Sequence, residues 1–85
     1  MPFDTVHNYY EQLVFNEIFS ATDGRNFDPD QIEDLACIAL NRLPPRYIRH
    51  NVDFSYYLSE GEYQEIIDKV KDAVAQAINI VSGNA

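Results

Sequence analysis

One internal segment constrains the fold most, because it carries both a helix start signal and a helix stop signal. Asp28 is followed by Pro29 and, three residues after Asp28, by Gln31. This is the order of an N-cap, a first helical residue and a capping box. Pro44 disfavours helical dihedral angles at the residue before it, and Pro45 extends that restriction. The segment therefore predicts a helix that begins after Asp28 and is left by a stiff, extended chain. Its predicted core face consists of Ile32, Leu35, Ala36, Ala39 and Leu43.

A first helix is predicted upstream. Asp4 or Thr5 can cap it, and the polar stretch 20–26, which contains Asp23-Gly24, ends it as a turn. Its apolar residues recur at helical spacing and form a stripe too wide for one partner helix to cover. They are Val6, Tyr10, Leu13, Val14, Phe15, Ile18 and Phe19.

The longest predicted helix opens at a second capping box, Ser59 with Glu62, and ends at Gly83. At about 1.5 Å per residue, its roughly 23 residues would span about 34 Å, more than a domain of this size needs to cover itself. Part of its apolar face steps at the 4-3-4-3-4 spacing of a helix–helix seam, which predicts either a dimer contact or an entirely intramolecular core. The seam residues are Tyr63, Ile67, Val70, Val74, Ala77 and Val81.

Length and composition favour one small globular domain spanning residues 1–85. Folding alone buries only about 60% of the unfolded surface of so short a chain, so a homodimer is expected. A hydrophobic content of 46% is too high for a disordered chain. The predicted fold is an all-α, three-helix domain with a short extended segment, Val52 to Leu58, between its second and third helices. The lack of a signal peptide or an apolar run of spanning length predicts a cytoplasmic protein without a membrane segment.

The charge pattern points to a small anionic ligand. The net charge is -8, which disfavours polymeric nucleic acid, because binding a duplex requires a broad basic face. Three of the four arginines nevertheless fall within one short stretch, as Arg42, Arg46 and Arg49. No Asp or Glu lies between Asp34 and Asp53 to neutralise them locally. Guanidinium groups in such a stretch are suited to phosphate.

The sequence shows no recognisable pattern of catalytic or metal-binding residues. His7 and His50 are the only histidines, and neither has a nucleophile or a carboxylate at a recognisable catalytic spacing. Cys37 is the only cysteine, so no zinc-binding spacing exists, and a small filler in a contact is its expected role. We expect neither an enzyme nor a bound cofactor or metal.

Residues 34–47 resemble the signature of the late competence development ComFB family, in which an acidic residue precedes an Ala-Leu-Asn-Arg-Leu-Pro-Pro-x-Tyr segment. Residues 8–14 resemble the first helix of the family, with Asn8, Glu11 and Val14 in matching places, so the resemblance covers roughly Val6 to Tyr47. It implies a bacterial, helical, dimeric receptor for cyclic dinucleotides, chiefly cyclic di-GMP and in some cases cyclic di-AMP. Some members bind zinc through a cysteine cluster, and the lone Cys37 departs from them, which removes zinc here.

The resemblance and the charge pattern agree on one region. The expected ligand-binding residues are Asn41, Arg42, Pro45, Arg46, Tyr47 and Arg49, with Asn8, Tyr9, Glu11 and Asp34 as further candidates. Tyr10 and Tyr56 are considered as additional stacking surfaces.

Several of these residues also have a structural alternative, whereas Arg46 and Arg49 are harder to explain in that way. Asn41 and Arg42 can bind carbonyl groups at the helix end, and Tyr47 can fill the core. Glu11 and Asp34 can pair with Arg42, which would make that arginine unavailable to phosphate. The sequence thus predicts a non-enzymatic receptor that relays a cyclic dinucleotide signal to a protein effector. The alternative is a ligand-free dimeric adaptor module.

Overall fold

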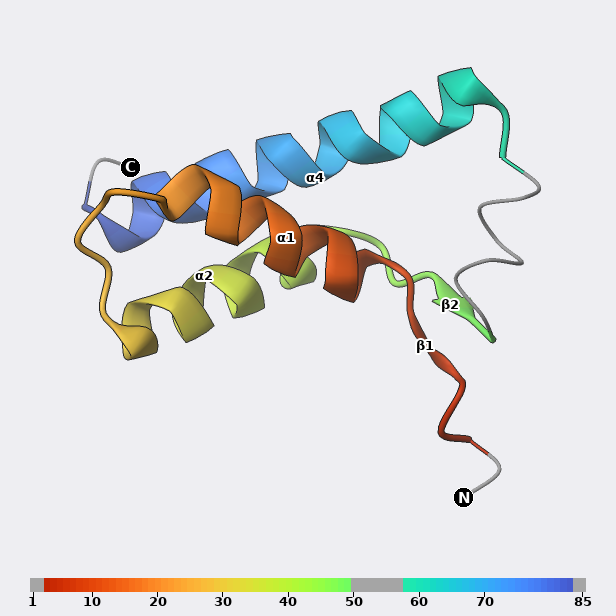
Figure 1. The fold of residues 1–85 in the computed structure, drawn as a ribbon, viewed down its shortest axis with the longest axis horizontal. Coiled ribbons are helices and arrows are strands. Elements are labelled where there is room, and N and C mark those ends of the chain that lie inside the picture. The colour runs from red at the N-terminus through yellow and green to blue at the C-terminus, as the bar shows by residue number, and fades with distance from the viewer. Residues whose placement is uncertain (1–2, 50–57, 84–85) are drawn as a thin grey trace.

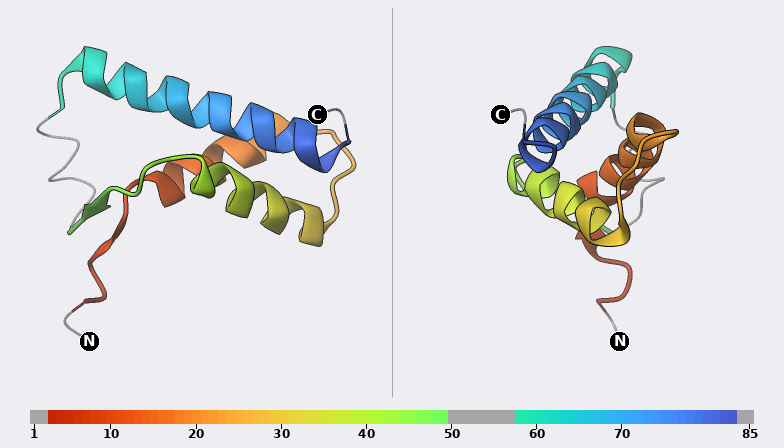
Figure 2. Two further views of the ribbon diagram at one scale, coloured as in Figure 1. Left: turned by 180° about the vertical axis from the view of Figure 1, so that it is seen from behind. Right: turned by 90° about the vertical axis from the view of Figure 1, so that its left-hand side faces the viewer.

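The computed structural model describes residues 3–49 and 58–83. Within these residues, three helices and two short strands form a small bundle in which each helix contacts the other two (Figures 1 and 2). This confirms the predicted three-helix architecture and adds a strand pair to it. In chain order the elements are β1 (His7–Asn8), α1 (Tyr10–Thr22), α2 (Pro29–Asn41), β2 (Tyr47–Ile48) and α4 (Glu60–Val81).

The start and end of α2 follow its local sequence. An Oδ1 atom of Asp28 accepts a hydrogen bond from the Gln31 backbone N–H at 2.8 Å, and Gln31 Oε1 accepts one from the Asp28 backbone N–H at 3.0 Å. The predicted capping box is therefore confirmed. Arg42 is the C-cap, and its backbone N–H donates to the Ala39 carbonyl, while the next N–H, that of Leu43, donates to the Leu40 carbonyl. The chain then leaves the helix at the two prolines, as predicted.

The predicted start of α1 is wrong. Neither Asp4 nor Thr5 caps the helix, which begins at Tyr10 after an N-cap residue, Tyr9, that makes no side-chain capping bond. Val6 lies outside the helix and is 46% exposed. Asp4 and Thr5 lie in a turn instead. The physical reason is long-range, because His7 and Asn8 are extended and pair with a strand that lies about forty positions further along the chain. The turn expected after the helix is present, with Gly24 at a φ of 75°.

The strand pair is antiparallel and joins the chain before α1 to the chain after α2. His7 pairs with Ile48 and Asn8 with Tyr47. The Tyr9 backbone N–H continues this contact by donating to the Arg46 carbonyl at 2.6 Å. The segment downstream of the two prolines is thereby fixed against the start of α1.

Helix α4 begins at the predicted cap. The Ser59 hydroxyl accepts a hydrogen bond from the Glu62 backbone N–H at 3.2 Å and donates to the Glu62 carboxylate at 3.1 Å. The helix ends before Gly83, which has a φ of 79°. The middle of the predicted seam lies within the core of this chain, whereas Tyr63, at one end of the seam, is 43% exposed. The intramolecular interpretation therefore holds for the seam residues Val70, Val74 and Ala77.

The core lies where the three helices meet. Its largest fully buried side chains come from all of them: Val14, Leu35, Val70 and Val74. Helix α1 has more apolar surface than this core covers, as its sequence predicted, since Phe15 is 39% exposed and Phe19 is 70% exposed.

No helix in residues 3–49 and 58–83 is long and apolar enough to cross a membrane. The predicted extended segment at Val52 to Leu58 lies, except for Leu58, outside the described residues, as do His50 and Tyr56.

Candidate functional site

The arginine-rich stretch from Arg42 to Arg49, called the basic window below, runs from the end of α2 through β2. Leu43 is buried and holds the start of the window in the core, whereas the arginines and the two prolines are exposed. Because each proline fixes its own φ angle, the window leaves the helix in a restricted direction. The window is therefore an exposed segment whose path is set by the fold.

Asn8 holds the middle of the window in place. Its side chain is buried, and its Oδ1 atom accepts hydrogen bonds from the Arg46 backbone N–H at 3.1 Å and the Tyr10 backbone N–H at 3.2 Å. One side-chain oxygen thus connects the window to the first turn of α1. The sequence makes Asn8 a further ligand-binding candidate, and the structure shows its amide oxygen buried and bonded within the fold.

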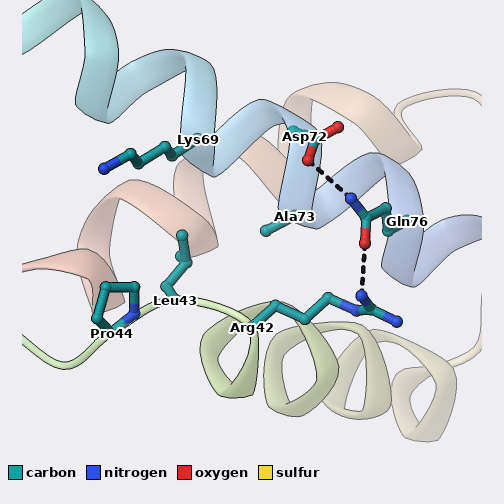
Figure 3. Close-up of a pocket in the computed structure, with 7 residues that line it drawn as sticks. All are labelled: Arg42, Leu43, Pro44, Lys69, Asp72, Ala73 and Gln76. Carbon is teal, nitrogen blue, oxygen red and sulfur yellow. Dashed lines mark hydrogen bonds between the residues drawn. The ribbon is translucent and has the colours of Figure 1, made fainter.

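Arg42 reaches across to α4. Its Nη1 atom donates to Gln76 Oε1 at 2.5 Å, and Gln76 Nε2 donates to Asp72 Oδ2 at 2.7 Å (Figure 3). The bond to Asp72 orients the Gln76 amide so that its oxygen faces the arginine. The structural alternative for Arg42 therefore has a different partner from the one expected, because neither Glu11 nor Asp34 bonds to it in the described structure.

A hollow of about 540 Å³ lies between the end of α2 and the middle of α4. Figure 3 shows the side chains of Lys69 and Arg42 extending toward opposite ends of this hollow, with Leu43 and Ala73 between them. Pro44 lines it as well, near the Lys69 end. The hollow thus combines two cationic side chains with an apolar floor.

The model of the late competence development protein ComFB family matches residues 7–85 of the chain. The chain belongs to the ComFB family. The match extends past the residues that carry the resemblance in sequence and includes all of α4, so both walls of the hollow lie within the ComFB region. A comparison with curated proteins finds no match.

Several predicted site residues of this ComFB chain are placed differently from expectation. Tyr9 and Tyr10 are buried, at 5% and 3% exposure, so their rings are unavailable for stacking on a ligand. Tyr47 does not fill the core, because its side chain is 68% exposed. The neighbouring Ile48 packs against the core instead, and side chains alternate between the two faces of a strand.

The hollow gathers only part of the predicted set. From the basic window it takes Arg42, Leu43 and Pro44. The remaining predicted residues lie elsewhere. On the helices, Asn41 is exposed at the last position of α2, Asp34 is exposed on α2, and Glu11 is half-buried on α1. The residues that are exposed along the path through β2 are Pro45, Arg46, Tyr47 and Arg49. The site is therefore a compact hollow that continues into an exposed segment.

Sequence reasoning missed the wall contributed by α4. Lys69, Asp72 and Gln76 are spaced by three and four residues, which places them on one side of a helix. They flank the core residues Val70 and Ala73, so a polar stripe beside the apolar seam was the available signal. Nothing in the sequence, however, showed which face of α2 this stripe would meet.

Cys37 is exposed on α2 and does not serve as a filler in a contact within the chain. Over the part of the ComFB chain that the structure describes, no three His, Cys, Asp or Glu side chains are grouped closely enough to hold a metal ion. The chemistry available in the hollow is that of guanidinium, ammonium, amide, carboxylate and apolar groups.

Proposed function

We propose that this ComFB protein is a non-enzymatic cytoplasmic receptor that binds a cyclic dinucleotide, cyclic di-GMP before cyclic di-AMP, and relays the signal to a protein partner. The observation that carries the proposal is the placement of Arg42 and Lys69 at opposite ends of one hollow. A cyclic dinucleotide has two phosphates on opposite sides of its sugar–phosphate ring, so two separated cations match its charge pattern. The ComFB family, whose model matches residues 7–85, is linked to receptors for cyclic dinucleotides, and this resemblance implies the same ligand class.

Arg42 keeps its capacity to bind phosphate despite its internal contact. A guanidinium has five N–H donors, and the bond to Gln76 uses one of them. Because Gln76 is a neutral amide, that contact orients the side chain without neutralising its charge. The carboxylate of Asp72 accepts from Gln76, and the charged groups that line the hollow leave it one positive charge in excess. A phosphate at the Arg42 end would therefore meet a positioned and charged donor group.

The rest of the hollow is suited to the bases and sugars. Leu43, Pro44 and Ala73 provide apolar contact surface, and about 540 Å³ falls within the range of small-molecule sites, roughly 300–1,000 Å³. Beyond the prolines, the exposed Tyr47 ring offers a stacking surface, and stacking of a base on an aromatic side chain contributes about 1–3 kcal/mol. Arg46 and Arg49 add cations along the same segment.

Isothermal titration of the purified protein with cyclic di-GMP and with cyclic di-AMP tests the proposal. We expect saturable binding of at least one of them, with a Kd below about 10 µM, and weaker binding at higher salt because charged contacts are screened. If neither nucleotide binds, the ligand-free adaptor replaces the receptor. The exposed phenylalanines of α1 are the observation that favours the adaptor.

We also expect the protein to form a homodimer in solution. Tyr63 and Ile80 of α4 are 43% and 40% exposed, and α4 carries Lys69 and Lys71 together with several carboxylates. Both signs of charge are present on this helix. Two copies can therefore pair through α4 without placing only like charges opposite one another. Sedimentation equilibrium at micromolar concentration should give about twice the chain mass of 9.8 kDa. A mass of one chain would contradict the dimer.

A further inference from the structure

A second hollow lies between α1 and α2 and is unlike the first. It measures about 270 Å³ and is called the apolar groove below. Phe15, which lines it, is 39% exposed, and Phe19 is 70% exposed, so two aromatic rings at one site are open to solvent. The residues that line the groove are Gln12, Phe15, Ile18, Phe19, Ile32 and Ala36.

The helices that form the groove carry charge of a single sign. Neither α1 nor α2 contains a Lys or an Arg, whereas they contain five carboxylates: Glu11, Glu17, Asp30, Glu33 and Asp34. Residues 1–41 as a whole contain eight Asp or Glu and one Arg, which accounts for -7 of the net charge of -8. The five other Lys and Arg residues follow in residues 42–85. The acidity of the protein is therefore concentrated in the part of the chain that contains α1 and α2.

Two of these carboxylates stand beside the groove on its two helices. Glu11 precedes Phe15 by four residues, so the two side chains lie about 40° apart around the α1 axis. Glu33 precedes Ala36 by three residues on α2, a separation of about 60°. Glu33 is exposed and Glu11 is half-buried. An apolar floor with an acidic rim is complementary to an apolar anchor with a basic rim.

We propose that the apolar groove docks an amphipathic helix of a partner protein, with two or three large apolar side chains facing the groove and Lys or Arg along both edges. The anchors of such a helix recur at i, i+3 or i+4, and i+7. They would lie over Phe15 and Phe19, and the basic edges would meet Glu11 and Glu33. Aromatic residues in a partly desolvated groove are the common centres of protein–protein interfaces.

Other occupants fit the groove less well. A second copy would bring two acidic surfaces together, because α1 and α2 carry no cation to pair with their own carboxylates. An anionic membrane surface is repelled by the same charges. At about 270 Å³, the groove lies at the lower edge of the volumes of small-molecule sites, roughly 300–1,000 Å³.

The inference goes beyond the proposed receptor and does not depend on it. The groove lies between α1 and α2, whereas the hollow of Arg42 and Lys69 lies between the end of α2 and α4, and the two share no lining residue. A partner at the groove therefore leaves the nucleotide site open. Failure of one proposal does not imply failure of the other.

Fluorescence anisotropy with a labelled synthetic peptide tests the groove. The probe is an 18-residue helical peptide with Leu or Phe at the anchor positions and Lys and Arg elsewhere, used with the full chain. Two further peptides serve as comparisons: one replaces every Lys and Arg by Glu, and one keeps the composition but scrambles the anchor spacing. We expect the basic amphipathic peptide to bind with a Kd of about 1–100 µM, and the other two at least tenfold more weakly.

Two single variants locate the binding. Phe19→Ser should weaken binding of the basic peptide about tenfold or more, with little loss of stability because the ring is exposed. Glu33→Lys should weaken it about threefold or more and should partly restore binding of the acidic peptide. Phe3→Ser is the matched control, since it removes a ring that is equally exposed, at 71%, and does not line the groove, so it should leave the Kd unchanged.

Several results would overturn the inference. Binding of the basic peptide that is weaker than about 1 mM, or equal binding of all three peptides, would remove the proposed complementarity. An unchanged Kd for Phe19→Ser would place the peptide elsewhere. A dimer that becomes a monomer on Phe19→Ser would show that a second copy occupies the groove. The affinity of the same variants for a cyclic dinucleotide should stay at the parent value. Measuring it distinguishes a failure of the groove proposal from a failure of the receptor proposal.

Discussion

Arg42→Ala should weaken cyclic dinucleotide binding about tenfold or more, because a charge-assisted hydrogen bond to phosphate contributes about 1.5–3 kcal/mol. The free energy of unfolding should fall by about 1 kcal/mol or less, since the internal partner is one exposed amide, that of Gln76. Isothermal titration and thermal unfolding of the same sample measure the two effects. Lys69→Ala should also weaken binding. The loss of affinity in Arg46→Ala and in Arg49→Ala measures how much the exposed segment after the prolines contributes to nucleotide binding.

Two control variants sharpen this comparison. Arg25→Ala removes the same charge from the turn between α1 and α2, where the guanidinium stands 5.7 Å from the Phe27 ring centroid. Arg25→Ala should leave the Kd for the nucleotide near the parent value. If Arg25→Ala and Arg42→Ala lost the same affinity, the loss would reflect the change in net charge alone. Arg42→Lys keeps the charge but loses the planar fork, and intermediate affinity is expected. Parent-like affinity in Arg42→Ala, Arg46→Ala and Arg49→Ala alike would remove the basic window from the site.

Asn8→Ala should destabilise the protein more than any of the arginine variants. It removes the acceptor of two backbone N–H groups, those of Tyr10 and Arg46, and leaving such groups unsatisfied costs about 2–4 kcal/mol for the pair. In a domain of this size each kcal/mol lowers Tm by about 4–8 °C. A fall of about 10–25 °C is therefore expected by calorimetry. The variant should also bind nucleotide less tightly, because the window loses its attachment to α1.

Asn8→Asp is the control for that prediction. A carboxylate retains an acceptor at the same position, and negative charge is favourable beside the first turn of a helix. Most of the lost stability should therefore return in Asn8→Asp. If Asn8→Ala melts within about 3 °C of the parent, which is less than 1 kcal/mol for this size, the Asn8 bridge does not hold the window.

The sequence predicted best what is determined locally. The start of α2 depends on Asp28, Pro29 and Gln31, which lie within one helical turn, and its end depends on the adjacent prolines. These signals operate whatever the rest of the chain does. The cap of α4 at Ser59 was predictable for the same reason.

The errors occur where distant segments meet. The apolar spacing at Val6 is helical, but no helix forms there, because the chain leads from a turn into a strand in which Asn8 pairs with Tyr47 across the fold. The same pairing directs Ile48 toward the core and leaves Tyr47 exposed. For the site, the basic window identified one wall of the hollow. The other wall, with Lys69, required the packing of α4 against α2, which no local pattern contains.

The most direct measurement for the central claim is a titration of ¹⁵N-labelled protein with cyclic di-GMP, followed by amide chemical shifts. We expect the largest shift changes in two segments, residues 42–49 without the two prolines and residues 69–76, and we expect both sets of changes to saturate together. The amides around Phe15 and Phe19 should change little. Saturable changes centred on the α1–α2 groove, or no changes at millimolar nucleotide, would contradict the claim that Arg42 and Lys69 form the nucleotide site.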